Sequence, residues 1–391
     1  MSQSPYAPCP WYRPMRARHS GEVHRTATPL ELFFDLCFVV AVAQAASTFE
    51  HELSQGRVGQ GLFGYTLVFF AIWWAWMNFA WFASAYDTDD VPYRLLTLVQ
   101  IAGALTMAAG IADALTEQDF TVVAWGYVVM RLAMVSQWLR AARADAERRR
   151  SCLRYALGIL ILQAGWLARL ALPHEGGVAS FAVLALGELA VPVWAERIAG
   201  TTWHPHHIAE RYGLFTLIVL GESIMAATLA VRTALDAEVA LGTVLADAAG
   251  GLLTVFALWW LYFAQDVPRR LAGLTTAMLW GYGHYVVFAA AAAVGAGLTL
   301  NVAHVTGHGS LTAHRAAAAY TVPVALFIAC VWLLHRQASQ LPLPADVLHP
   351  VAVIAVLATT FTGFPVLGTG VVASLLIAAT LVVTHRRAGR A

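Results

Sequence analysis

Two carboxylates stand at the start of the first long apolar segment of the chain. Glu31 and Asp35 lie four residues apart, inside an apolar run from Pro29 to about Phe49. Residues four apart share one face of a helix, so both acids point the same way. A charge in hydrocarbon costs about 3 kcal/mol on insertion scales. We therefore expect Glu31 to serve the helix N-terminus near the headgroups, with Thr28 as N-cap, and Asp35 to face a buried partner or a water-filled site.

Further ionisable side chains fall in the middle of apolar segments. With Asp35 they are our candidates for an ion or proton pathway: Glu222, Glu188, Arg131 and His284. Isolated charges do not sit in lipid, so we expect Arg131 to face the protein interior and to bind Glu188, Glu222 or Asp35. At least one carboxylate then lacks a cation, and burial favours the protonated form of such a group. His284 fits a hydrogen-bonded contact between helices better than a proton relay.

A second set of charges lies where segments begin or end, at the predicted cytoplasmic rim: Glu31, Glu210, Arg211, Asp87, Arg94, Asp266 and Arg270. Asp87 with Arg94, and Asp266 with Arg270, are spaced to bridge a turn, and such surface ion pairs contribute little to stability. The segment 204–207, His-Pro-His-His, is interpreted as a solvated loop rather than a metal site. The tryptophans between 73 and 81 are interpreted as packing residues.

The composition is that of a polytopic all-α membrane protein. Of 391 residues, 59% are hydrophobic and 12% are charged, and mean hydropathy is +0.63; soluble proteins carry about 25% charged residues. All 24 basic residues are arginine. The absence of lysine excludes a P-loop and any retinal or pyridoxal phosphate held as a Schiff base. The four scattered cysteines indicate neither disulfides nor zinc, so we expect no metal and no cofactor. No basic stripe suggests nucleic acid as a partner.

Apolar segments of about 20 residues are long enough to cross a bilayer. Twelve such segments are predicted: 30–49, 62–85, 93–113, 120–142, 152–172, 178–197, 208–230, 241–264, 272–300, 315–335, 347–362 and 365–385. If the N-terminus is cytoplasmic, nineteen of the 24 arginines fall on the cytoplasmic side and four, including Arg315, on the other. This asymmetry follows the positive-inside rule and predicts that both termini are cytoplasmic. The basic, proline-rich tail 1–28 is expected to be disordered.

An internal repeat divides the apolar part of the chain. Glu31, Trp81 and Asp87 recur 179 residues later as Glu210, Trp260 and Asp266, and each aspartate is followed by a Val-Pro-x-Arg sequence. The repeat predicts three parts, which are the tail 1–28, a six-helix repeat 29–205 and a second six-helix repeat 206–391. An even number of spans per half makes the repeat parallel, about an axis along the membrane normal. Within the second half, the small residues from 289 to 297 predict a close approach between helices.

Two stretches resemble the signature sequences of the bacterial low temperature requirement protein A family. The first is Glu-Leu-Phe-Phe-Asp-Leu-Cys-Phe-Val from Glu31, preceded by His24-Arg25, and the second is Glu-Arg-Tyr-Gly-Leu-Phe-Thr-Leu-Ile-Val-Leu-Gly-Glu-Ser from Glu210. The resemblance covers about residues 24–385 and implies a multi-pass protein of the bacterial inner membrane. The repeat also resembles, in part, the lysosomal potassium channels with Phe-Ser-Asp motifs. Here the serine is missing beside Asp35, and Leu214-Phe215 has no aspartate.

These features favour a transporter or ion-conducting protein that handles protons or cations with intramembrane carboxylates. Its partners are then the lipid bilayer and an ion or small solute. An intramembrane enzyme using Glu222 or His284 is one alternative, although no GxSxG or HExxH motif supports it. A non-catalytic membrane factor that acts through partners is the other. The sequence leaves the oligomeric state open.

Overall fold

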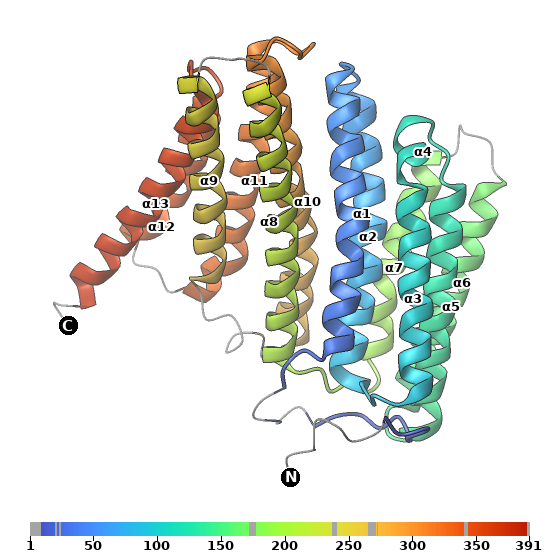
Figure 1. Cartoon of the computed structure of the whole chain (residues 1–391). Helices are drawn as coiled ribbons and strands as arrows, with labels where there is room; N and C mark the ends of the chain where they lie inside the picture. Colours follow the sequence, from blue (N-terminus) through green and yellow to red (C-terminus); the bar gives the residue numbers. More distant parts are fainter. Residues whose placement is uncertain are drawn as a thin grey trace. The chain divides into compact units, whose positions relative to one another are not determined.

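The chain folds into helices only. The computed structural model describes residues 9–19, 22, 25–171, 177–236, 241–264, 271, 273–339 and 343–388. These residues form thirteen α-helices and no strand, which confirms the predicted all-α class (Figure 1). The helices are α1 (Pro29–Ser54), α2 (Val58–Tyr86), α3 (Val91–Ala109), α4 (Ile111–Thr116), α5 (Thr121–Ala144), α6 (Arg149–Leu170), α7 (Gly177–Glu196), α8 (Pro205–Asp236), α9 (Leu241–Phe263), α10 (Leu274–Val305), α11 (Ala313–Ser339), α12 (Leu343–Thr359) and α13 (Pro365–Ala388).

Each predicted span coincides with a helix, and the segment 93–113 is divided between α3 and the short α4. Within the described part of the chain, eleven helices are long and apolar enough to cross a membrane. The predicted span that is not among these eleven is 347–362, which corresponds to α12. This helix has 17 residues, fewer than the roughly 20 needed for a full crossing. The chain is therefore a polytopic helical membrane protein, and the count of twelve spans stays a prediction.

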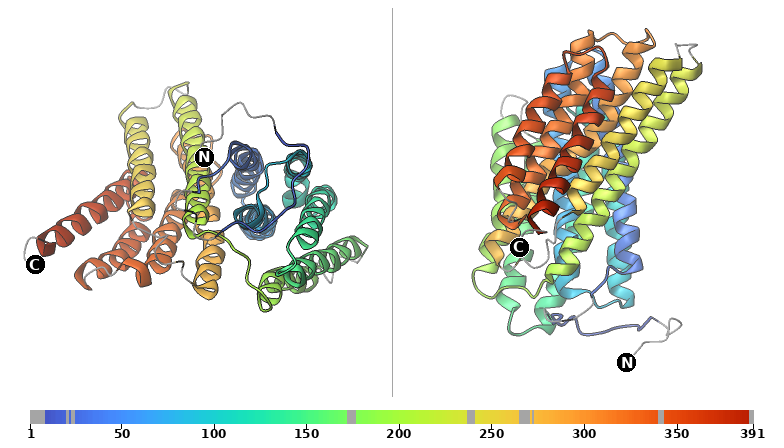
Figure 2. Two further views of the ribbon diagram at one scale, coloured as in Figure 1. Left: turned by 90° about the horizontal axis from the view of Figure 1, so that it is seen from below. Right: turned by 90° about the vertical axis from the view of Figure 1, so that its left-hand side faces the viewer.

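The helices group into two compact units. Unit 1 comprises Met1–Ala41 and Trp74–Arg211, and unit 2 comprises Val42–Trp73 and Tyr212–Ala391. In unit 1, α3 packs against α5, α5 against α6, and α6 against α7 (Figure 2). In unit 2, α11 packs against α10 and α12, and α13 packs against α12 and α9. The two six-helix repeats proposed for 29–205 and 206–391 stay a prediction.

Small residues allow close helix contacts in both units. On α3, a Cβ added to Gly103 would collide with the backbone of Gly126 on α5. On α10, a Cβ added to Gly297 would collide with the backbone of Ala319 on α11. The second contact confirms that the small residues from 289 to 297 let helices approach closely.

The described part of the N-terminal tail is ordered, contrary to our expectation of disorder. The backbone N–H of Arg13 donates to the Asp90 carboxylate at 2.8 Å, and that of Arg18 donates to the carbonyl of Ala85 at 2.9 Å. Asp90 also caps α3, because its carboxylate accepts from the backbone N–H of Tyr93 at 2.9 Å. The tail therefore lies on the turn between α2 and α3, within unit 1.

Candidate functional site

Arg211 of α8 and Asp35 of α1 form a buried ion pair in unit 1. The Asp35 carboxylate accepts from Nε of Arg211 at 2.9 Å and from Nη2 at 2.5 Å, which is a bidentate geometry. Trp76 of α2 donates its indole N–H to the same carboxylate at 2.6 Å. The side chains of Asp35 and Arg211 are both 0% exposed. The buried partner expected for Asp35 is therefore Arg211, not Arg131.

Glu31 extends this cluster toward the start of α1. Its carboxylate accepts from the backbone N–H of Thr28 at 2.7 Å, while the Thr28 hydroxyl accepts from the Glu31 N–H at 3.3 Å. This reciprocal pair is a capping box, so Glu31 does serve the helix N-terminus as expected. Its Oε1 also lies 3.2 Å from Arg211 Nη1, 3.2 Å from His207 Nε2 and 3.4 Å from Arg25 Nη2. We call Arg25, Glu31, Asp35, His207 and Arg211 the Arg211 cluster.

One interpretation of the α8 region is wrong. The segment 204–207 is not a solvated loop, because His204 and His207 are buried and α8 begins at Pro205. Arg211, which the sequence assigns to the cytoplasmic rim, lies near the start of α8 with its side chain fully buried. Its neighbour Glu210 is only partly buried and accepts the backbone N–H of Ala27 at 3.2 Å.

Arg131 and Glu188 form a second buried pair in unit 1. Arg131 of α5 donates from Nη2 to Oε2 of Glu188 on α7 at 2.7 Å, and the two side chains are 2% and 0% exposed. The prediction that Arg131 binds an intramembrane carboxylate is confirmed. Glu188 also accepts the indole N–H of Trp74 at 2.9 Å, the hydroxyl of Tyr127 at 3.0 Å and the indole N–H of Trp166 at 3.3 Å. This carboxylate is therefore neutralised and fully hydrogen-bonded, which is typical of a fixed structural pair.

The ion pair expected at the turn after α2 forms with a different acid. Arg94 donates to both carboxylate oxygens of Asp89, at 2.7 and 2.9 Å, and not to Asp87. Asp89 has a φ of 46°, in the left-handed region, which turns its side chain toward α3. Asp87 instead lies 3.6 Å from Arg18 of the tail. The corresponding pair of the second repeat, Asp266 and Arg270, lies outside the described residues.

Asp87 follows the last residue of α2 and is only 7% exposed. Burial raises the pKa of Asp87 from 3.8 to about 6, and the negative charges of Glu31 and Asp89 act in the same direction. The positive charges of Arg25 and Arg18 oppose this rise. Asp87 is therefore a group outside the apolar spans that changes its charge near physiological pH.

We expect Asp87→Asn to become more stable relative to the wild type as pH rises. The folded-state pKa lies above the unfolded-state value, so the stability that Asp87 contributes is complete below about pH 4 and is lost as pH rises through about 6. Asparagine does not ionise. The difference in free energy of unfolding between the two proteins should widen by about 1 kcal/mol between pH 5 and pH 8. Thermal unfolding in detergent at both pH values measures it.

The matched control is Asp113→Asn, at an exposed position of α4. It makes the same chemical change at a surface position and provides the baseline for the comparison at pH 5 and pH 8. An Asp87→Asn difference that stays constant with pH would contradict the assignment of Asp87 as the titrating group.

His284 of α10 is a hydrogen-bonded core residue of unit 2, as expected. Its Nδ1 donates to the Trp280 carbonyl at 2.7 Å, and the hydroxyl of Tyr262 on α9 donates to Nε2 at 2.9 Å. The His284 side chain is buried, with both ring nitrogens engaged. This arrangement fixes the ring between α9 and α10.

Glu222 and Asp247, in the apolar helices of unit 2, have no cation among the described residues. Glu222 of α8 is partly buried, and Asp247 of α9 is 6% exposed. Neither makes an ion pair or a side-chain hydrogen bond with any described residue. The sequence analysis predicts such an unpaired group at Glu222 and not at Asp247, although an acid inside the segment 241–264 is visible in the sequence. These two acids differ from Asp35 and Glu188, whose charges are neutralised by arginine.

The candidate site therefore has two parts with different chemistry. The carboxylates of Asp35 and Glu188 in unit 1 are paired with arginines from other helices, while those of Glu222 and Asp247 in unit 2 have no cation among the described residues. Among the described residues, no group of three or more His, Cys, Asp and Glu side chains could hold a metal ion.

Comparisons with known proteins match nearly the whole chain. Residues 26–384 match the family model of the bacterial low temperature requirement A protein, LtrA. The chain is also 26% identical over 330 residues to an uncharacterized protein of Rhizobium meliloti (strain 1021), an alignment that covers 80% of this chain and 78% of that protein. The region matched by the family model includes most of the Arg211 cluster and both unpaired acids.

Proposed function

Because this chain belongs to the bacterial low temperature requirement A family and is a polytopic membrane protein, we propose that it moves protons or cations across the membrane. The carboxylates that would carry them are Asp247 and Glu222. The arginine asymmetry supports a place in the bacterial inner membrane with both termini in the cytoplasm.

The observation that carries the proposal is the unpaired, buried Asp247. Only 6% of this residue is exposed, and its carboxylate forms no ion pair and no hydrogen bond with any described residue. Ionisable residues within membrane spans are costly and are retained mainly at ion, proton or substrate pathways. A structural role would call for a partner such as Arg211 provides for Asp35. Asp247 is thus buried like a structural acid such as Asp35, but it has no arginine partner among the described residues.

Glu222 supports the same proposal from another helix of unit 2. It lies in the apolar part of α8, Pro205–Leu229. A Cβ added to the preceding Gly221 would meet no atom within 4 Å, so the space beside Glu222 is open. The following residue, Ser223, is buried and donates its hydroxyl to the Ala291 carbonyl of α10 at 2.8 Å. Gly221 is exposed, so this open space lies at the outer face of α8, while Ser223 fixes the other side of the helix to α10.

For transport, each of these acids would alternate between its neutral, protonated form and its anionic form. A carboxylate without a cation in a low-dielectric site favours its neutral, protonated form. Release of the proton leaves an anion that a second proton or a cation neutralises. Each acid would thus bind its cargo from one side and release it to the other when access changes.

We expect Asp247→Asn and Glu222→Gln each to reduce proton flux to the background of protein-free liposomes. Both replacements keep the size and hydrogen bonding of the side chain but cannot ionise. The full-length protein is reconstituted into proteoliposomes that contain a pH-sensitive dye, and a potassium diffusion potential drives proton entry. The same vesicles with sodium- and potassium-sensitive dyes test the two cations.

Matched controls are Asp113→Asn and Glu117→Gln, which make the same chemical changes outside the eleven apolar spans. They should leave the flux at the wild-type rate. If Asp247→Asn and Glu222→Gln transport with unchanged rate and pH dependence, the two acids are structural. A wild-type protein that moves no proton, sodium or potassium above background would refute the proposal as a whole.

A further inference from the structure

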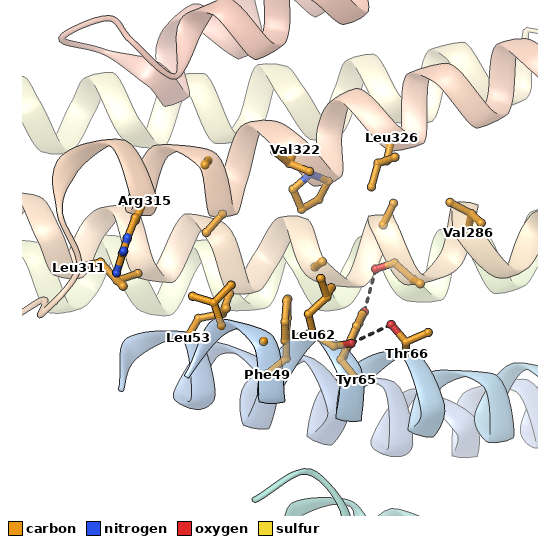
Figure 3. A pocket seen from close by; sticks show the side chains of 18 of the residues that line it. Phe49, Leu53, Leu62, Tyr65, Thr66, Val286, Leu311, Arg315, Val322 and Leu326 are labelled. Atoms are coloured by element: carbon orange, nitrogen blue, oxygen red, sulfur yellow. Dashed lines mark hydrogen bonds between the residues drawn. The ribbon is translucent and has the colours of Figure 1, made fainter. Parts of the chain in front are cut away.

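Unit 2 contains a cavity of about 660 Å³. Its walls are the second half of α1 and the first half of α2 on one side, and α10 and α11 on the other (Figure 3). The volume lies within the range of known small-molecule sites, about 300–1,000 Å³. Most of the lining is apolar, with Leu53, Leu62, Val322 and Leu326 among its side chains. Because these helices have the length and composition of membrane spans, the cavity is suited to a ligand supplied by the bilayer.

Hydrogen bonds between residues of the lining join the two walls. The hydroxyl of Tyr65 on α2 donates to the Ala289 carbonyl of α10 at 2.7 Å, and the hydroxyl of Tyr285 on α10 donates to the Thr66 carbonyl of α2 at 2.8 Å. The ring of Phe49 stacks on Tyr65 with centroids 4.5 Å apart. These contacts hold the walls at a fixed separation, so the cavity is preformed.

One end of the cavity carries a positive charge. Figure 3 shows Arg315 beside Leu311 at that end, while Val286 and Leu326 lie toward the other. Arg315 is the third residue of α11, its side chain is exposed, and no described residue forms an ion pair or hydrogen bond with it. A guanidinium group without an acid binds phosphate through two parallel hydrogen bonds. The cavity thus combines a long apolar chamber with an unpaired cation at its end.

We propose that this cavity binds an anionic phospholipid, with one acyl chain in the chamber and the phosphate on Arg315. The apolar lining matches the chain, and the guanidinium matches the headgroup in charge and geometry. A phospholipid is the occupant because the bilayer presents its chain and its phosphate together, at the depth of these helices. Lipid binding of this kind does not depend on transport through Asp247 or Glu222.

The test is native mass spectrometry of the full-length protein in detergent. Dioleoylphosphatidylglycerol is compared with dioleoylglycerol, which has the same chains and no phosphate. The wild type should bind the first phosphatidylglycerol molecule about tenfold more tightly than dioleoylglycerol, a gain typical of one charge-assisted contact. Arg315→Gln should abolish that preference and leave dioleoylglycerol binding unchanged.

Gly59→Trp tests the chamber itself. Gly59 lines the cavity at the first turn of α2, and a Cβ added there meets no atom within 4 Å, so an indole can occupy the chamber without a collision at its base. This variant should weaken the binding of both lipids by about tenfold or more. The matched controls are Gly363→Trp, at another glycine with open space, and Arg150→Gln, at an exposed arginine of unit 1. Both should bind lipid like the wild type.

Three outcomes would overturn the proposal. Wild-type affinity in a folded Gly59→Trp protein would show that the chamber does not hold the chain. A preserved preference for phosphatidylglycerol in Arg315→Gln would show that the phosphate lies elsewhere. Binding of oleate at this cavity without any phospholipid would make the occupant a fatty acid. None of these outcomes depends on flux, so the lipid site and the transport proposal can fail separately.

Discussion

Arg211→Leu is expected to remove most of the folded protein. The guanidinium is fully buried between Asp35 and Glu31, and it is bidentate on Asp35. Removing one partner of a buried ion pair leaves an uncompensated charge and costs about 3–5 kcal/mol. That is a large fraction of the roughly 5–15 kcal/mol that stabilises a typical domain. Folded yield in detergent, measured by fluorescence-detected size exclusion, reports the loss.

Two further variants test whether the uncompensated buried charge causes the loss of folded protein in Arg211→Leu. Arg94→Gln removes an arginine whose pair with Asp89 is about half exposed on both sides, so it should cost at most about 1 kcal/mol. Asp35→Asn combined with Arg211→Gln removes both charges, yet the amide oxygen of the introduced asparagine would still accept the indole N–H of Trp76. This double variant should recover part of the lost yield. An Arg211→Leu protein with wild-type yield would show that the pair contributes little to folding.

The case of Arg211 shows which part of the fold the sequence could predict. Hydrophobic length is a local property, so all twelve predicted segments coincide with helices. Partner choice is not local, because Asp35 and Arg211 are 176 residues apart in the chain. The sequence placed Arg211 near the start of a span, where an exposed position and a buried one look alike. Only the packing of the chain within unit 1 decides between them.

The tryptophans illustrate the same limit. We interpreted the cluster from 73 to 81 as packing, and Trp74 and Trp76 are indeed buried. Both also donate indole N–H groups to intramembrane carboxylates, Glu188 and Asp35. An indole presents an apolar ring and one donor, so its burial is predictable from composition while the acceptor is not. Asp247 was overlooked for a related reason, because one acid in an apolar segment does not reveal whether it faces protein, water or lipid.

Arg131→Met is expected to lower the free energy of unfolding by about 3–5 kcal/mol. The reason is again a carboxylate left buried, since Glu188 is 0% exposed and Arg131 is the one cation that contacts it among the described residues. Methionine fills a similar volume, so the effect reports the lost charge rather than a cavity. Thermal unfolding in detergent and folded yield give the measurement. Arg154→Met, at a partly exposed arginine of the same unit, should have little effect.

A second variant tests the charge of Glu188 itself, and it must keep an acceptor for the three other side chains that donate hydrogen bonds to Glu188. Replacing Glu188 by an apolar residue would leave the N–H and O–H groups of Trp74, Tyr127 and Trp166 without their acceptor. Glutamine keeps an acceptor oxygen and has no charge, so Arg131→Met with Glu188→Gln should be more stable than Arg131→Met alone. If the double variant is no more stable than the single one, the cost arises from lost packing around Arg131. If the double variant recovers most of the lost stability, the role of Arg131 is to neutralise the buried charge of Glu188. Asp247 and Glu222 then differ from Glu188 in lacking such a compensating cation among the described residues.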